Sequence, residues 1–464
     1  MFSSFSFDRS RCALWAVSLA LFCVSLDFFA LNLALPDMAA DLHVAAGGLQ
    51  WALSGYMLAS GALMTAAGRL GDLFGHRRLL LFGVGLFGAS SLMCGLSGSA
   101  TELVAFRVLQ GAGVAFVMPV GLALLTHVFD EDRRAKANGF VFGVAGVGLV
   151  LGPFVGGLLT QTVGWRSVFW LNVPFTVLSL VLASRVQLKH DASSARAVDW
   201  PGLVTVTAAI ASLTVALDRG RAWGWTSGRT LGLLAAGVLL LAVFVAVESK
   251  VARPLVDLAL FRNRMFVIIT AGGAVASAAA SVYLFGASLY LQEVRHFPAG
   301  TAGLVLLVPA VATAAAGPLA GRLGGIAPLK VMAGAGAVGG LAVLGLGLTS
   351  WLPLYVLFLA VCGGALKLSN TFTVIATQGV IRPERAGEAS GVTLTAIVTA
   401  GGVGIALAGS ALGAQGVTTS AVRSTLVATA VVCLVSAGIL VAARLHQAHR
   451  AARTLPEAVA PVQG

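Results

Sequence analysis

The sequence predicts an all-α protein that crosses a membrane many times. Its 464 residues are 58% hydrophobic and only 10% charged, with a mean hydropathy of +0.93, a balance that soluble domains do not have. The apolar stretches are continuous and about 20 residues long, which is the length that a helix needs to span a bilayer. They lack the alternation typical of β-barrel strands, and an open backbone cannot be satisfied in lipid, so we expect helices.

About fourteen such spans follow one another along the chain. We expect them near residues 12–35, 49–68, 79–98, 102–126, 138–160, 167–184, 201–217, 230–248, 265–290, 301–320, 330–349, 353–378, 390–413 and 424–443. Residues 1–185 are predicted to form one six-helix half and residues 261–445 the other. The linker 186–260 would carry two additional helices, and residues 446–464 a cytoplasmic tail.

Arginine and lysine concentrate on alternate loops. The richer set contains Arg69, Arg77, Arg78, Arg133, Arg134, Lys136, Arg185, Lys189, Arg196, Lys250, Arg253, Arg262, Arg264, Arg322, Lys330, Arg382 and Arg385. The opposite set is limited to Arg166, Arg219, Arg221, Arg229, Arg295 and Arg423. The positive-inside rule assigns the richer set and both termini to the cytoplasm, which agrees with an even number of helices. The net charge of +12 therefore reflects loop topology, and we expect no nucleic-acid partner.

Short repeats predict that the two halves share one architecture. Residues 67–71 read Ala-Gly-Arg-Leu-Gly and recur at residues 320–324. The segment that enters the fifth span, residues 134–139, has a similar counterpart at residues 385–391. The offsets agree within a residue or two, which is the behaviour of two parallel six-helix halves with a helix pair inserted between them.

Asp27 lies inside the first apolar run, whereas the other acids lie in loops or near segment ends. A carboxylate at bilayer depth is costly and usually faces a water-filled cavity or a partner. One interpretation is that the first helix ends early and leaves Asp27 at its outer edge. The other is that Asp27 is a proton or substrate site.

The loop at residues 68–80 combines closely spaced glycines with one acid among arginines. The glycines, which allow a tight turn and close helix contact, are Gly68, Gly71 and Gly75. The charged residues, which can lock and release neighbouring helix ends, are Asp72, Arg69, Arg77 and Arg78. An ordinary basic cytoplasmic loop is the alternative.

This loop resembles motif A of the major facilitator superfamily, and three further stretches agree. Residues 26–36 resemble the first-helix motif of the fourteen-helix drug:proton antiporters, and residues 107–113 resemble motif B in the fourth helix. Residues 148–157 resemble motif C, the fifth-helix signature associated with antiporters. The motifs span the first half in the right order, and the helix count extends the resemblance over nearly the whole chain. It implies the major facilitator fold.

Asp27 and Arg107 are predicted to lie at one depth. Both are six or seven residues from the outer ends of their helices, which at about 1.5 Å per residue is roughly 10 Å below the outer surface. A guanidinium near the acid favours its charged form, and withdrawal of the guanidinium favours protonation, so the pair would couple proton binding to helix position. The resemblance also implies that Arg107 takes part in proton transfer. A static ion pair that serves only the structure is the alternative.

The glycines of the fifth span follow a four-residue spacing that makes one flat helix face. This face contains Gly148, Gly152 and Gly156, next to Pro153 and Gly157. Because proline removes a backbone donor and bends a helix, we expect a hinge at the seam between the halves. Tight helix packing alone would also explain the glycines.

Lys367 is an unexpected charge near the middle of the span at residues 353–378, where the superfamily helix is Gly-rich and uncharged. Snorkelling to an interface is one interpretation. The other is a cavity-facing lysine that favours an anionic or hydrogen-bonding substrate. Asn32, Gln110 and Asn370 complete the polar residues assigned to the cavity.

Together these features predict a proton-coupled antiporter that exports a drug, antibiotic or secondary metabolite, neutral or weakly anionic, by alternating access. The alternative is an exporter or facilitator of an endogenous metabolite without proton antiport. A membrane enzyme is disfavoured because no His, Asp or Ser cluster and no phosphate-binding loop is found. We expect a monomer in the cell membrane, with protons, a small-molecule substrate and lipid as partners, and without metal or cofactor.

Overall fold

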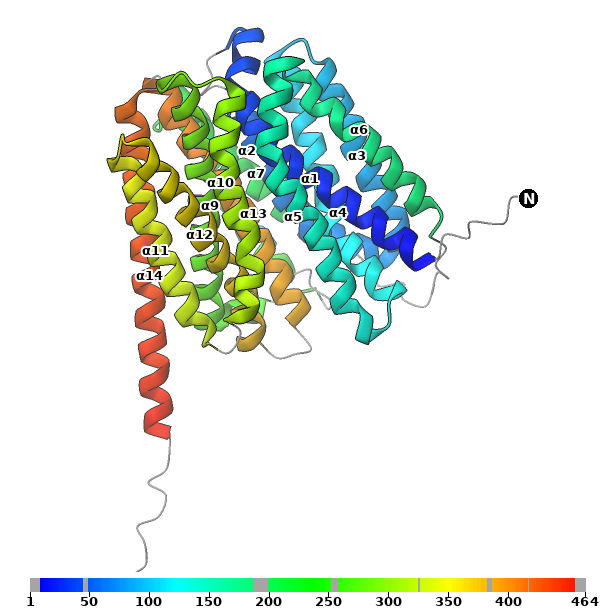
Figure 1. The fold of residues 1–464 in the computed structure, drawn as a ribbon. Helices are drawn as coiled ribbons and strands as arrows, with labels where there is room; N and C mark the ends of the chain where they lie inside the picture. The colour runs from blue at the N-terminus through cyan, green and yellow to red at the C-terminus, as the bar shows by residue number, and fades with distance from the viewer. Residues whose placement is uncertain are drawn as a thin grey trace, which may run out of the picture.

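The computed structural model describes residues 9–44, 49–186, 199–251, 258–323, 326–381, 386–415 and 417–454, and these form an all-helical bundle (Figure 1). The first six helices are α1 (Arg9–Asp41), α2 (Trp51–Phe74), α3 (His76–Leu96), α4 (Ala100–Val128), α5 (Glu131–Thr162) and α6 (Arg166–Ser184). Next come α7 (Trp200–Trp223) and α8 (Gly228–Glu248). The last six are α9 (Arg264–Leu289), α10 (Ala299–Arg322), α11 (Pro328–Leu348), α12 (Leu352–Val380), α13 (Ala386–Gln415) and α14 (Thr419–Thr454).

These helices match the predicted membrane spans. Thirteen of the described helices are long and apolar enough to cross a membrane, and α2 is the remaining long helix. A short 3-10 helix (Leu258–Arg262) precedes α9, and a π-helical turn (Tyr290–Val294) follows it. The all-helical polytopic fold expected from composition is thus confirmed. The tail predicted from residue 446 begins as helix, because α14 continues to Thr454.

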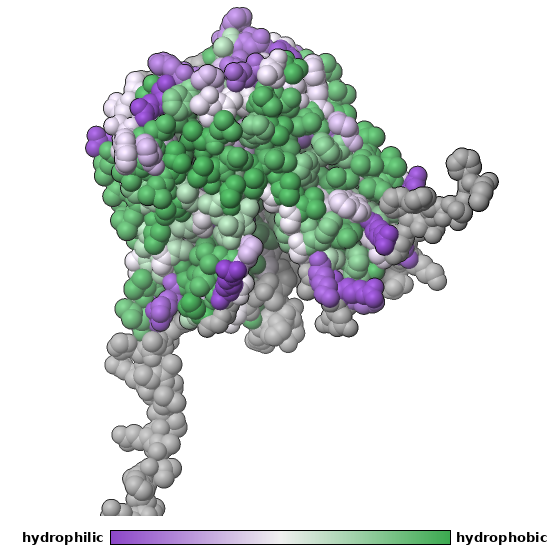
Figure 2. Space-filling model, in the orientation of Figure 1, coloured by the Kyte–Doolittle hydropathy of each residue, from purple (hydrophilic) through white to green (hydrophobic). Residues whose placement is uncertain are grey.

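The first six helices pack against one another, and the last six repeat the arrangement. In the first bundle α1 lies against α5 and α6, and α4 lies against α2 and α3. In the second bundle α9 lies against α13 and α14, and α12 lies against α10 and α11. The pair α7–α8 joins the molecule through α7, which contacts both α2 and α13. The outer surface is broadly apolar, as a surface facing lipid must be (Figure 2).

The two bundles touch through α5 against α10 and α2 against α13. The contacts include Gly157 with Ala299 and Gln50 with Gly409, all near the ends of the helices on the side where α1 terminates. Towards the opposite side the bundles diverge (Figure 1), and the surface is hollowed between them at the lower edge (Figure 2). The molecule is therefore closed on the side where α1 ends and open on the side where α1 begins.

A proline in α1 creates one of the contacts between the bundles. Pro36 lies inside α1 and has no N–H, so the carbonyl of Asn32, four residues earlier, lacks its helical donor. The Ser288 hydroxyl of α9 donates a hydrogen bond to this carbonyl. Helix α1 therefore continues past the predicted end of the first span to Asp41, fourteen residues beyond Asp27. The interpretation that the helix ends at Asp27 is wrong.

Candidate functional site

Asp27 and Arg107 form an ion pair in the interior of the first bundle. Nη1 of Arg107 donates to Oδ2 of Asp27 across 2.6 Å, and both side chains are 0% exposed. The depth match expected from the sequence is therefore correct for these two residues. A charge removed from water in this way is tolerated only when a partner of opposite sign and further hydrogen bonds satisfy it.

Amide side chains complete the surroundings of the pair. Oε1 of Gln110 accepts from Arg107 Nη1 at 2.7 Å, and Nε2 of Gln110 lies 3.4 Å from Asp27 Oδ1. Asn172 of α6 donates through Nδ2 to the same Oδ1 at 2.9 Å. The Asp27 carboxylate thus accepts hydrogen bonds from α4 and α6, while α5 packs against the neighbouring residues of α1.

The guanidinium of Arg107 is held on its other side by α2. Its Nε donates to the Ala52 carbonyl at 2.8 Å, and its Cζ lies 4.1 Å from the centroid of the Tyr56 ring. The backbones come this close because motif B has a glycine: a Cβ at Gly111 would lie 2.9 Å from Tyr56 Cα. Gly111 therefore lets α4 approach α2 so that Arg107 reaches both Ala52 and Asp27.

Sequence reasoning missed Asn172 and Tyr56. Asn172 stands alone in the apolar run Phe-Trp-Leu-Asn-Val-Pro-Phe at residues 169–175, and this isolated amide at membrane depth was the available signal. It is 1% exposed. Tyr56 gave no such signal, because an aromatic residue in an apolar span is ordinary.

The motif C glycines form the contact between α5 and two other helices. A Cβ at Gly148 would lie 2.5 Å from the Phe22 carbonyl oxygen, and one at Gly156 would lie 2.5 Å from Ala30 Cα, both in α1. On another face a Cβ at Gly303 of α10 would lie 2.5 Å from the Pro153 carbonyl oxygen. Gly152 also contacts α1, and Gly157 contacts α10. Motif C thus joins α1 to the second bundle.

The motif A stretch is helical rather than a loop, which corrects the sequence prediction. Helix α2 runs through Phe74 and α3 begins at His76, so the turn consists of Gly75, whose φ is +92°. A single residue in this conformation reverses the chain, and only glycine adopts it without strain. Gly68 and Gly71 do not turn the chain; they face Pro119 and Val120 of α4.

The charged residues of motif A are only partly described. The side chains of Asp72 and Arg69 lie outside the described residues, so the expected ion pairs of Asp72 remain predictions. Arg77 donates to the carbonyls of Ala183, at 3.2 Å, and Ser184. These carbonyls belong to the last turn of α6, where a cation is favourable. Arg78 is exposed.

Comparison with known proteins identifies the family. The sequence profile described as Major Facilitator Superfamily matches residues 17–405. The chain belongs to the major facilitator superfamily. Two solved structures show the same fold. The human organic anion transporter MFSD10 has a TM-score of 0.65 at 15% identity over 93% of this chain and 99% of its own. The nucleoside transporter NupG has a TM-score of 0.68 at 13% identity over 94% and 99%.

Bacterial resistance proteins of the superfamily are similar in sequence. The tetracenomycin C resistance and export protein of Streptomyces glaucescens is 36% identical over 74% of this chain and 64% of its own length. The multidrug resistance protein Stp of Mycobacterium tuberculosis is 33% identical over 74% and 65%. The lincomycin resistance protein of Streptomyces lincolnensis is 38% identical over 52% and 50%. The match thus spans less than two thirds of the length of these relatives.

Three other residues were predicted to line the cavity: Asn32, Lys367 and Asn370. None of them forms a hydrogen bond with Asp27 or Arg107 among the described contacts. Asn32 is buried, and its Nδ2 donates to the Phe28 carbonyl at 2.9 Å within α1. Lys367 is exposed near the middle of α12, and Asn370, one turn further, is half-buried. Lys367 and Asn370 therefore belong to the second bundle, whereas Asp27, Arg107 and Gln110 belong to the first.

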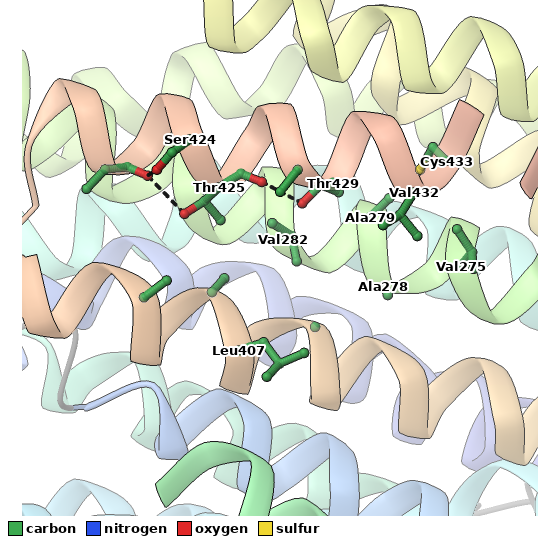
Figure 3. Close-up of a pocket in the computed structure, with 15 residues that line it drawn as sticks. Val275, Ala278, Ala279, Val282, Leu407, Ser424, Thr425, Thr429, Val432 and Cys433 are labelled. Atoms are coloured by element: carbon green, nitrogen blue, oxygen red, sulfur yellow. Dashed lines mark hydrogen bonds between the residues drawn. The ribbon is translucent and has the colours of Figure 1, made fainter. Parts of the chain in front are cut away.

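A separate apolar groove lies between α9, α13 and α14 (Figure 3). Its volume is about 450 Å³. The hydroxyls of Ser424, Thr425 and Thr429 line it, but each donates to a carbonyl of its own helix, four residues earlier or fewer. The groove is therefore chemically apolar, and none of the predicted site residues lines it.

Proposed function

We propose that this chain exports small organic molecules in exchange for protons, by alternating access. The buried Asp27–Arg107 ion pair is the observation that carries the proposal. A proton that binds Asp27 removes half of the pair and leaves the Arg107 charge in the interior, which is costly unless the helices move. Proton binding and helix position are thereby coupled.

The opening of the molecule supports the export direction of the proposal. The open side is the one where α1 begins, and the charge distribution of the loops predicts that this side is cytoplasmic. Asp27 is inaccessible to solvent in this conformation. A substrate would enter from the cytoplasm, and Asp27 would receive its proton only after the outer side opens. This is the order that the proposed antiport cycle requires.

Two further elements have mechanical roles in the proposal. Motif C contacts α1 through its glycines and α10 through Pro153 and Gly157, so a bend at Pro153 would move one bundle relative to the other. Motif A would lock the cytoplasmic ends through Gly68, Asp72, Gly75, Arg77 and Arg78. Arg77, which already ties the start of α3 to the end of α6, supports this role.

The substrates would be neutral or weakly anionic drugs, antibiotics or secondary metabolites. The relatives named for tetracenomycin C and lincomycin support an antibiotic. The acid of the first bundle is engaged by Arg107, and the exposed charge on α12 is the cation Lys367. A free acid in the cavity would attract lipophilic cations and a lysine there would repel them, so this charge distribution favours other compounds. The alternative is export of an endogenous metabolite without proton antiport.

Liposomes that contain the purified chain test the proposal with tetracenomycin C as the probe. An imposed pH gradient should drive its accumulation by the wild type, and Asp27→Asn should abolish the response to the gradient. The matched control is Asp41→Asn, because Asp41 forms an exposed pair with Arg166 at 2.7 Å. Accumulation that ignores the gradient and survives Asp27→Asn would contradict proton antiport and favour the alternative.

A further inference from the structure

We propose that Asn172 is a positioning residue for the proton-binding carboxyl group of Asp27. Its amide would donate a hydrogen bond to the charged carboxylate and accept one from the protonated acid. The inference rests on the proposed proton-coupling role of Asp27. It adds a third helix, α6, to a site that the sequence motifs place on α1 and α4. Two observations carry it: the hydrogen bonds of the Asn172 amide, and the one polar atom of this side chain that lacks a partner among the residues that the structure describes.

The donor role follows from two hydrogen bonds of the Asn172 Nδ2 group. One N–H donates to Asp27 Oδ1 at 2.9 Å, and the other donates to Ser91 Oγ at 3.1 Å. The Ser91 hydroxyl donates in turn to the Phe169 carbonyl at 2.9 Å, one turn before Asn172 in α6. Both amide hydrogens are thus used, and Ser91 fixes the orientation that points one of them at the carboxylate.

The acceptor role follows from the Asn172 carbonyl oxygen. Oδ1 is buried and has no hydrogen-bond partner within the described part of the chain. An unpaired buried acceptor costs free energy in this state, and its use in another state would account for its presence. Rotation of the amide by half a turn exchanges Oδ1 with Nδ2 and points Oδ1 at Asp27. A proton bound to Asp27 Oδ1 can then be donated to Asn172, and the Ser91 hydroxyl can donate to the same oxygen.

This exchange gives the protonated acid a buried acceptor, at the cost of the two hydrogen bonds that the Asn172 N–H groups donate in the ion-paired state. The proton forms a bond to the carboxylate oxygen, the negative charge is neutralised, and no other group changes its protonation. Without an acceptor on Asn172, the new O–H group would be buried unsatisfied, because Arg107 offers only donors and the Oε1 acceptor of Gln110 is engaged by Arg107. Asn172 would therefore keep protonated Asp27 satisfied while Arg107 turns to other acceptors.

Several titratable or charged groups face Asp27 among the described residues. Arg107 comes from α4, Tyr56 from α2, Cys94 from α3 and Cys23 from α1 itself. Arg107 is the permanent charge in this set, and the phenol and thiols are buried groups that stay neutral near pH 7. None of these neighbours is therefore expected to change its charge when Asp27 titrates near neutral pH.

Infrared difference spectroscopy on the full chain in liposomes can test the inference without a known substrate. Carbon-13 labelling of aspartate separates these carboxyls from those of glutamate, and the band that Asp27→Asn removes is assigned to Asp27. We expect Asn172→Leu to move the midpoint of that titration to higher pH by about one pH unit, because the lost hydrogen bond to the charged carboxylate is roughly twice as strong as the lost neutral hydrogen bond from the protonated acid. The protonated C=O band should also shift, because its acceptor is lost.

Ser179→Ala is the matched control. Ser179 is a buried residue of α6 that donates to the Ala16 carbonyl of α1 at 2.7 Å, two turns away from Asn172. Its loss should leave the Asp27 midpoint unchanged. Ser91→Ala is a second test variant that keeps the amide and removes its anchor, and it should move the midpoint in the same direction by a smaller amount. If Asn172→Leu does not fold, the midpoint of Ser91→Ala tests the role of Asn172.

The outcomes separate the inference from the proposed function. An Asp27 band that titrates at the wild-type midpoint in both Asn172→Leu and Ser91→Ala overturns the role of Asn172 and leaves proton coupling intact. An equal shift in Ser179→Ala overturns it as well, because general loosening of α6 would then be the cause. If no titrating band depends on Asp27 even in the wild type, the proposed function itself fails.

Discussion

Nη1 of Arg107 lies 2.6 Å from Oδ2 of Asp27, and neither side chain is accessible to solvent. The pair joins α1 to α4 at a point where α2 and α6 also converge, through the Ala52 carbonyl and Asn172. Four helices of the first bundle are therefore linked to the charge state of one carboxylate. Breaking the pair should affect both transport and stability.

We expect Asp27→Asn to lower the stability of the protein by about 3 kcal/mol or more, because Arg107 is left as an uncompensated buried charge. The double variant Asp27→Asn/Arg107→Leu should recover part of this loss, since it removes the stranded charge. Asp41→Asn should change stability by about 1 kcal/mol at most, because Asp41 is 47% exposed in its pair with Arg166. Thermal unfolding of the purified proteins in detergent measures the stability of all three variants. An equal loss of stability in Asp27→Asn and Asp41→Asn would contradict the expectation.

Gly156→Ala should destabilise the contact between α1 and α5. The added Cβ would lie 2.5 Å from Ala30 Cα, so the two helices must separate, at a cost of about 1–3 kcal/mol. Gly146→Ala in the same helix is the control, because its Cβ would meet nothing within 4 Å. The control should be neutral or slightly stabilising. Thermal unfolding distinguishes the two, and a harmless Gly156→Ala would show that the contact is not tight.

Ser288→Ala should favour opening of the outer side. The hydroxyl satisfies the Asn32 carbonyl that Pro36 leaves without a donor, and it does so across the two bundles. Its loss removes a hydrogen bond that exists only when the outer side is closed. Distances between spin labels on the outer ends of α2 and α13 should show a larger open population.

Thr270→Val is the control for that measurement. Its hydroxyl lies 3.2 Å from that of Thr393, inside the second bundle, so both conformations keep the contact. A larger open population in both variants would indicate a general loss of packing rather than a specific contact between the bundles.

Lys367→Ala should selectively reduce resistance to neutral and weakly anionic compounds. The expectation follows from an exposed cation near the middle of α12 that can attract such molecules. A susceptibility panel in a pump-deficient host should compare tetracenomycin C, lincomycin and dicationic dyes. Lys330→Ala, which removes an exposed cation at the start of α11, should leave the profile unchanged. A wild-type profile dominated by dicationic dyes would contradict the proposed substrate class.

Much of this molecule could be predicted from the sequence because the membrane imposes simple constraints. Helix number and helix type follow from the length of apolar runs and the need to satisfy the backbone in lipid. Asp27 was conspicuous for the same reason, since an acid at that depth requires a partner. The helical rise places Arg107 at the same depth, so the sequence predicts the ion pair between Asp27 and Arg107.

Other features of this molecule depend on how the helices pack, and the order of apolar spans along the chain does not contain that information. The contact of Asn172 with Asp27 depends on how α6 packs against α1 and α3, and residues 145 positions apart carry no local signal. The one-residue turn at Gly75 depends on a backbone conformation, so glycine-rich sequence suggested a longer loop. The donor for the Asn32 carbonyl comes from the other bundle, where only the closed outer side brings Ser288 within reach. The sequence by itself determined which groups could not remain alone in lipid, and packing determined which partners they received.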